Sequence, residues 1–184
     1  LSGLYLTAVG QNAGSAQAGA SDDNNTWIGY EAGKLANGSG LGQNTAVGSL
    51  AGSNITTGSQ NSLLGYAAGY SITTGNYNTA VGREAYSGGT GNPTFSVAIG
   101  YLSSYTGAGD FNVSVGSSAM QNLTTGSSNT AIGYTALHGV GASSNNTAVG
   151  RRAGYAQSTS TDTYNVWVGQ GAGQTANGSA QGRN

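Results

Sequence analysis

The sequence NTAVG occurs at residues 44–48, 78–82 and 146–150, and the variant NTAIG occurs at residues 129–133. A catalytic pocket needs unlike residues brought together once. A segment that recurs along a chain is instead typical of a structural unit that stacks on copies of itself. The glycine that ends each copy therefore marks a repeat.

Ten such anchor glycines extend the pattern over almost the whole sequence. Successive anchors lie 16 to 19 residues apart, with a mean of about 17.7. They are Gly10, Gly29, Gly48, Gly65, Gly82, Gly100, Gly116, Gly133, Gly150 and Gly169. We interpret residues 1–184 as a single repeat domain and expect it to be a segment of a longer fibre.

Each anchor follows a short segment that predicts a strand. The residue before the anchor is always apolar and mostly β-branched, and the residue two positions earlier is threonine, valine or, once, serine. Branched residues at every second position share one face of a strand. We expect these two columns to face inward. The face between them is mostly alanine with Trp27, Leu63 and Trp167, and we predict that it is an interface with another copy of the chain.

Other positions in the repeat are equally regular. Alanine lies three residues after the anchor in nine repeats, which indicates a narrow interior, and asparagine lies four residues before it in eight. Asparagine favours turns, and stacked amides can hydrogen-bond along the axis of an array. Glycine at the anchor permits a positive φ. The segments ITTG at 55–58 and 72–75 and LTTG at 123–126 indicate a second short stretch in the repeat.

A unit of about 18 residues without a helical period predicts an all-β parallel β-solenoid of about ten coils of 16–19 residues, each rising about 4.8 Å. Such a thin coil buries little apolar surface to offset its loss of backbone entropy. We therefore expect an obligate homo-oligomer.

Composition argues against several classes of protein. Five basic and six acidic residues give a net charge of −1, which provides no electrostatic basis for binding nucleic acid. Without cysteine there are no disulfides, catalytic thiols or thiolate metal sites. No apolar run approaches the roughly 20 residues that cross a bilayer, no signal peptide opens the sequence, and we expect no membrane insertion in this segment.

The sequence offers no pattern that predicts catalysis. The acidic residues are scattered apart from Asp22 and Asp23, whereas glycoside hydrolysis needs two neighbouring carboxyl groups. GYEAGKL at 29–35 is one residue short of a phosphate loop, and GGTGN at 88–92 has Asn92 where a calcium-binding repeat has aspartate. The single histidine, His138, is expected at an ordinary surface position. We predict a protein that is not an enzyme and has no catalytic, cofactor or metal site.

Tyrosines recur at two positions of the repeat. One set directly follows the anchor, and Tyr70, Tyr105 and Tyr155 lie five residues after it. A tyrosine combines an apolar ring with a hydroxyl group that can contact sugars or proteins. We favour a structural ladder in which each tyrosine packs on the tyrosine of the neighbouring coil, and we retain Tyr70, Tyr105 and Tyr155 as candidate surface contacts.

The segments NTAVGSLAG (44–52), SVAIGYLSS (96–104), NTAIGYTAL (129–137) and NTAVGRRAG (146–154) resemble the NSVAIGxxA repeat of YadA-like head domains in trimeric autotransporter adhesins. The longer form TTGSSNTAIGYTAL (124–137) resembles the version found in bacteriophage tail fibres. The resemblance covers nearly the whole chain and implies a left-handed β-roll with three chains around a threefold axis. The repeats here are longer than the family's 14 or 15 residues, and threonine often replaces valine three residues before the glycine. Both departures favour the phage type.

These observations lead to several functional hypotheses. The first is a structural and adhesive segment of a homotrimeric extracellular fibre at a virion surface, contacting a host cell-surface glycan or protein and other fibre or virion proteins. The alternative is the head of a bacterial trimeric autotransporter adhesin at the outer surface of the cell. An ice-binding solenoid is a more distant alternative, because its threonine rows face solvent whereas we expect this threonine column to face inward. An enzyme ranks last.

Overall fold

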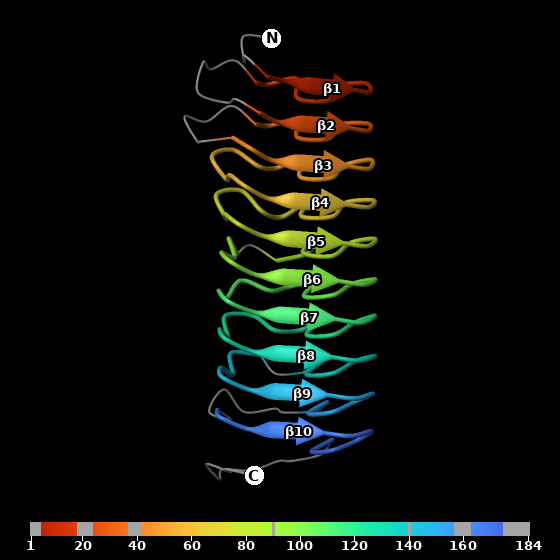
Figure 1. Cartoon of the computed structure of the whole chain (residues 1–184), viewed down its shortest axis with the longest axis vertical. Coiled ribbons are helices and arrows are strands. Elements are labelled where there is room, and N and C mark those ends of the chain that lie inside the picture. Colours follow the sequence, from red (N-terminus) through yellow and green to blue (C-terminus); the bar gives the residue numbers. More distant parts are fainter. Residues whose placement is uncertain are drawn as a thin grey trace.

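The computed structural model of the chain is a β-solenoid with one strand in each repeat (Figure 1). It describes residues 5–17, 24–36, 42–89, 91–139, 141–156 and 163–174. The strands are β1 (Thr7–Val9), β2 (Thr26–Ile28), β3 (Thr45–Val47), β4 (Ser62–Leu64), β5 (Thr79–Val81), β6 (Val97–Ile99), β7 (Val113–Val115), β8 (Thr130–Ile132), β9 (Thr147–Val149) and β10 (Val166–Val168). Each occupies the segment predicted before an anchor glycine.

The ten strands form one parallel sheet in chain order, from β1 to β10 (Figure 1). Equivalent residues pair across every boundary; in the middle of the sheet, for example, Thr79 is opposite Val97 and Val81 is opposite Ile99. The predicted register and the predicted all-β parallel solenoid are therefore confirmed. The described part of the chain contains no helix long and apolar enough to cross a membrane.

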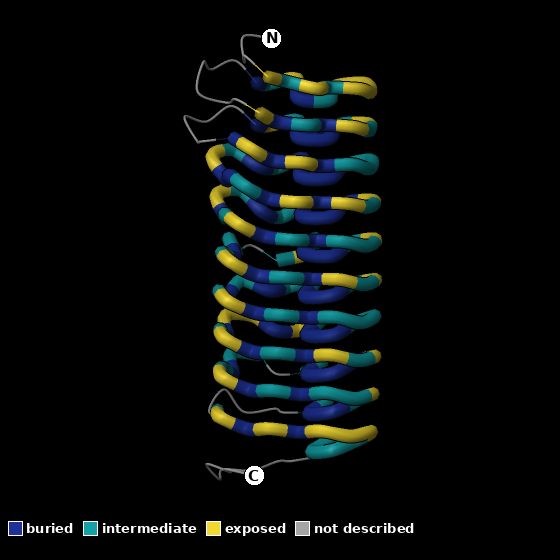
Figure 2. The backbone as a smooth tube through the Cα atoms, viewed as in Figure 1, coloured by how far each residue is buried: buried dark blue, intermediate teal, exposed yellow. Residues whose placement is uncertain are grey.

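The faces of the strands are the reverse of the prediction. The middle residue of the strand is buried in β2 to β10, whereas the branched residues on either side of it are exposed or half-exposed. Figure 2 shows this alternation at the same place in each repeat. Trp27, Leu63 and Trp167 retain 0, 2 and 8% of their accessible surface. The proposal that they contact another copy is therefore wrong, because they fill the interior of their own coil.

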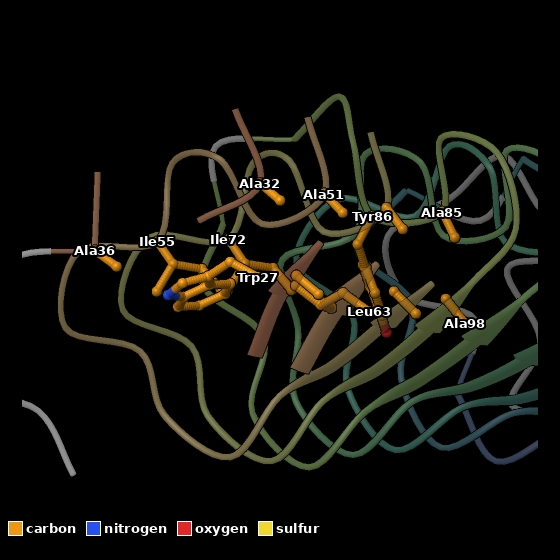
Figure 3. Close-up of a cluster of buried hydrophobic side chains, with 13 residues drawn as sticks. Trp27, Ala32, Ala36, Ala51, Ile55, Leu63, Ile72, Ala85, Tyr86 and Ala98 are labelled. Carbon is orange, nitrogen blue, oxygen red and sulfur yellow. The ribbon is translucent and has the colours of Figure 1, made fainter. Parts of the chain in front are cut away.

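The narrowness of the coil explains the reversal. A three-residue strand has one side chain on one face and two on the other. The interior side of the coil is bounded by alanines such as Ala32 and Ala51, which are fully buried, and it accommodates only one strand residue in each layer. Figure 3 shows Trp27, Leu63 and Ile72 within this space. The face with two branched residues is left outside.

In six of the ten repeats, residues six positions apart fill the interior as complementary pairs. Where the strand residue is large, its partner is glycine, as in Trp27 with Gly33, Leu63 with Gly69 and Trp167 with Gly173. In three repeats the strand residue is small and its partner is large and buried, as in Ala80 with Tyr86, Ser114 with Met120 and Ala131 with Leu137. Both positions are small in the remaining repeats, for example Ala46 with Gly52 and Ala148 with Gly154. Added Cβ atoms at the three glycines would overlap the paired Trp or Leu side chains. Close packing in the layers that are small at both positions is completed by the adjacent coil, because a Cβ atom on Gly52 would meet Leu63 and one on Gly154 would meet Trp167.

The asparagine column forms the predicted ladder. Asn61 donates from both its backbone nitrogen and its Nδ2 to Oδ1 of Asn44, each at 3.0 Å, and its own Oδ1 accepts the same two bonds from Asn78. The Nδ2 of Asn61 also donates to the carbonyl of Gly75 at 2.9 Å. These residues are at most 2% exposed, so the ladder satisfies polar groups that burial would otherwise destabilise.

The anchor glycines have the predicted positive φ, between 123° and 138°. A second constraint adds to this. A Cβ atom on Gly10 would lie 2.5 Å from the carbonyl oxygen of Gly29, the next anchor along the axis. The coils therefore approach each other so closely at the anchor that only glycine fits.

Candidate interaction surfaces

The exposed face of the sheet carries a continuous row of aliphatic side chains, which we call the aliphatic stripe. Its members directly precede the anchors: Val9, Ile28, Val47, Leu64, Val81, Ile99, Val115, Ile132, Val149 and Val168. Six of them are 37 to 70% exposed, from Ile28 to Val168, and the other four are half-buried. Isolated apolar residues are common at protein surfaces, whereas a continuous row of this length indicates a contact.

A second outward row runs beside the stripe at the first strand position. It consists of Thr7, Thr26, Thr45, Ser62, Thr79, Val97, Val113, Thr130, Thr147 and Val166. No charged residue occurs in any of the ten strands. The backbone amides and carbonyls of these strands bond to the strands above and below. The sheet face therefore offers methyl groups and a few hydroxyl groups, which suits an uncharged partner surface.

An aromatic ladder flanks this face in the middle of the solenoid. The rings of Tyr77 and Phe95 stack with centroids 4.5 Å apart, and those of Phe95 and Phe111 with centroids 5.6 Å apart. All three are about half-exposed. Gln43 and Gln60 occupy the same position of the repeat and hydrogen-bond at 2.9 Å. Sequence reasoning missed this column, because its residues differ in type and share only their position five residues before the anchor.

Arg83 lies between two of the tyrosines that directly follow an anchor. The Arg83 guanidinium carbon lies 5.6 Å from the ring centroid of Tyr66 and 5.8 Å from that of Tyr101. Arg83 also donates to Glu84 Oε1 at 3.2 and 3.3 Å. The contacts differ from the predicted ladder of tyrosine on tyrosine, because Arg83 lies between the rings of Tyr66 and Tyr101.

The three tyrosines predicted as surface contacts are all half-buried. Tyr155 stacks on His138 with ring centroids 5.1 Å apart. Tyr70 and Tyr105 instead line one cavity of about 300 Å³, together with Leu50, Tyr66, Ala67, Glu84 and Ser87. The structure therefore brings two of the three predicted residues together at a hollow in the surface.

Glu31, Lys34 and Asp110 make local polar contacts. Glu31 and Lys34 form an ion pair at 3.0 Å, and the hydrogen bond from Lys34 holds the pKa of Glu31 below its usual value. Asp110 Oδ1 accepts the backbone N–H of Thr94 at 2.9 Å. Burial lowers the pKa of His138.

Asn92, in the segment that resembles a calcium-binding repeat, acts as a turn cap. Its Oδ1 accepts hydrogen bonds from the backbone nitrogen and hydroxyl group of Thr73 and from the backbone nitrogen of Thr74, at 2.7 to 2.8 Å. Within the described residues, no three histidine, aspartate or glutamate side chains are grouped to hold a metal ion. Asp22, Asp23 and Asp162 lie outside the described residues.

Comparison of the chain with protein-family models, with curated proteins and with solved structures gave no match.

Proposed function

We propose that this chain is a structural and adhesive segment of a homotrimeric extracellular fibre, of the bacteriophage tail-fibre type, that projects toward or contacts a host surface. The observation that supports the proposal most directly is the aliphatic stripe, which remains exposed along the whole sheet of a single chain. The left-handed coil and the threefold arrangement are inferred from the resemblance of the NTAVG repeats to YadA-like heads.

The stripe favours self-association over folding as an isolated chain. Complete burial of an aliphatic side chain contributes about 1.5–3 kcal/mol. Six stripe residues are 37 to 70% exposed, so covering each of them would contribute about 1 kcal/mol. These six residues would contribute about 6 kcal/mol per chain before the entropic cost of association, and each of the four half-buried residues would contribute less. This contribution is large compared with the marginal stability of a thin coil.

A second copy of this chain is the partner that matches the stripe in period. The stripe presents one side chain per strand at the spacing between strands of a sheet, about 4.8 Å. Only a partner with the same axial repeat can place one side chain between each pair of neighbouring stripe side chains along all ten strands. Parallel copies related by a rotation axis have this property, and closed symmetry is the usual outcome for homo-oligomers.

The mass of the particle in solution tests the proposal. Light scattering with size-exclusion chromatography should give three times the chain mass of 18.1 kDa. Introducing charge in the stripe with Val115→Asp and Ile132→Asp should abolish the trimer, because a buried unpaired carboxylate is strongly unfavourable. Asn122→Asp adds the same charge at an exposed turn residue and should leave the trimer intact. A wild-type chain that folds as a monomer would refute the proposal.

A bacterial adhesin head is the alternative with the same fold and the same oligomer. Sequence flanking the segment separates the two. A C-terminal coiled coil with a membrane barrel marks the adhesin, whereas an attachment region for the particle or an intramolecular chaperone marks the phage fibre.

An ice-binding solenoid is a second candidate, and the structure removes the argument raised against it. The threonine column faces outward, beside the stripe, so the flat sheet displays rows of hydroxyl and methyl groups. Ice binding requires this sheet face to be open to solvent, whereas the fibre requires it to be covered by other copies of the chain. Thermal hysteresis of the purified wild-type protein that disappears in Thr130→Tyr would favour ice binding, and a trimer without hysteresis would favour the fibre.

A further inference from the structure

We propose that the cavity between the fourth and sixth repeats binds a single pyranose ring of a saccharide. Its lining residues lie one to five positions beyond an anchor glycine, on the turns of the repeats and not on the strands. The site would supply a ligand for the proposed adhesive role. That the sugar belongs to a host surface rests on the proposed function. The binding chemistry follows from the residues themselves.

The cavity exists because one ring is missing from a column of tyrosines. Tyr70 in the fourth repeat and Tyr105 in the sixth lie at the same position, and the residue between them in the fifth repeat is Ser87. The rings of Tyr70 and Tyr105, which lie two coils apart, therefore flank the small side chain of Ser87. The volume of about 300 Å³ is at the lower end for ligand sites, and it suits one sugar ring.

The aromatic walls are held in place without a ligand. The ring of Tyr105 rests against the backbone at Gly88, where a Cβ atom would overlap Cε1 and Cζ of the ring. The ring of Tyr66 packs under the guanidinium group of Arg83, 5.6 Å from the ring centroid. Walls that are fixed in advance reduce the entropy lost when a ligand binds.

The polar groups are those that recognise sugar hydroxyl groups. The Ser87 hydroxyl can donate and accept a hydrogen bond, and the carboxylate of Glu84 accepts. Arg83 offsets the charge of Glu84 through hydrogen bonds of 3.2 and 3.3 Å. We therefore do not expect the site to bind a free cation. Tyrosine rings, Leu50 and Ala67 face the apolar C–H groups of the sugar. A purely apolar ligand would leave Ser87 and Glu84 desolvated without partners.

Saturation-transfer NMR on the full chain, with methyl glycosides of glucose, galactose, mannose, rhamnose, N-acetylglucosamine and N-acetylgalactosamine as probes, tests the site. We expect transfer to at least one glycoside. Ser87→Tyr restores the missing ring and should weaken that binding at least tenfold, as should Tyr105→Ala. Tyr155→Ala removes a tyrosine at the same position of the repeat but outside the cavity, and it should bind as the wild type does.

Absence of transfer to every glycoside overturns the proposal, as does unchanged binding in Ser87→Tyr. Ser87→Tyr keeps the test decisive if Tyr105→Ala fails to fold, because this position already accepts tyrosine in three other repeats. The oligomer is measured separately. If the protein is a trimer but binds no glycoside, only the proposed sugar site is wrong. If it is a monomer that binds a glycoside, only the proposed trimer is wrong.

Discussion

Inside the solenoid, the indole Nε1 of Trp27 donates a 2.8 Å hydrogen bond to Oε1 of Gln17, a residue of the preceding repeat. Both side chains are almost completely buried. The bond joins two coils through the interior and satisfies the one polar atom of the largest side chain in the core. Trp27 is therefore a core residue whose surroundings are adapted to it, which is inconsistent with a role at a surface.

The first prediction concerns this pair. Gln17→Leu should lower the free energy of unfolding by about 1–3 kcal/mol, because the indole N–H loses a partner and stays buried. Trp27→Ala should cost about 3–5 kcal/mol through the cavity that it leaves. Chemical denaturation followed by circular dichroism measures both. Gln43→Leu, at an exposed glutamine, is the control and should change the value by less than about 0.5 kcal/mol; an equal loss there would contradict the assignment.

The second prediction separates the two constraints on the anchor glycines. Gly82 and Gly169 both have positive φ, of 126° and 123°. An added Cβ atom would lie 2.7 Å from the carbonyl oxygen of Gly100 in the first case and would have no neighbour within 4 Å in the second. Gly169→Ala should cost about 1–3 kcal/mol for backbone strain alone. Gly82→Ala should cost about 1–3 kcal/mol more through overpacking. Equal losses would show that the approach between coils is unimportant.

Much of the fold could be predicted because its rules act locally. The backbone conformation at each position allows only certain residue types, such as glycine at Gly82 and asparagine at Asn61. The spacing of these residues in the sequence is therefore enough to locate the strands and to align each strand with the next. The face of the strand could not be predicted in this way. Alternation shows that Thr79 and Val81 share a face, but it does not show which face is inside.

The missing information was a relationship between residues six positions apart. Trp27 is followed by Gly33, and Ala80 by Tyr86. Such complementary volumes, which occur in six of the ten repeats, indicate that the middle of the strand faces the interior. The cavity was less accessible to sequence reasoning. Tyr105 could be selected from its column, but the hollow depends on Ser87, where no ring occurs, and on Gly88, whose lack of a side chain leaves room for the Tyr105 ring.

The third prediction concerns the asparagine ladder. Asn61→Ala removes an acceptor for two bonds from Asn78 and two donors inside the coil, and it should destabilise by about 2–4 kcal/mol. Asn61→Ser should cost less, because serine already occupies this position in the sixth repeat. There the Ser96 hydroxyl accepts the backbone N–H of Asn112 at 3.1 Å. Thermal unfolding of the two variants tests the order, and a serine variant no more stable than the alanine variant would contradict it.

The fourth prediction concerns the salt dependence of the oligomer. The strand face contains no charged residue, so association through the stripe should be unaffected by raising sodium chloride from about 0.1 to 1 M, which screens ion pairs. Sodium sulfate should strengthen it, because this salt favours burial of apolar surface. Sedimentation velocity at low protein concentration measures the fraction of trimer. Dissociation in sodium chloride would show that charged turn residues, and not the stripe, hold the chains together.

The last prediction concerns the stability of the core at high pH. Burial raises the pKa of the Tyr86 hydroxyl from its usual 10.0 to about 12. The folded state therefore favours the neutral phenol. Its contribution is fully present below pH 10 and is lost as the pH rises through 12, because the unfolded chain releases the proton first. The total loss should not exceed about 3 kcal/mol. The free energy of unfolding of Tyr86→Phe should depend less on pH over this range. Identical pH profiles for the two proteins would show that another group causes the loss of stability.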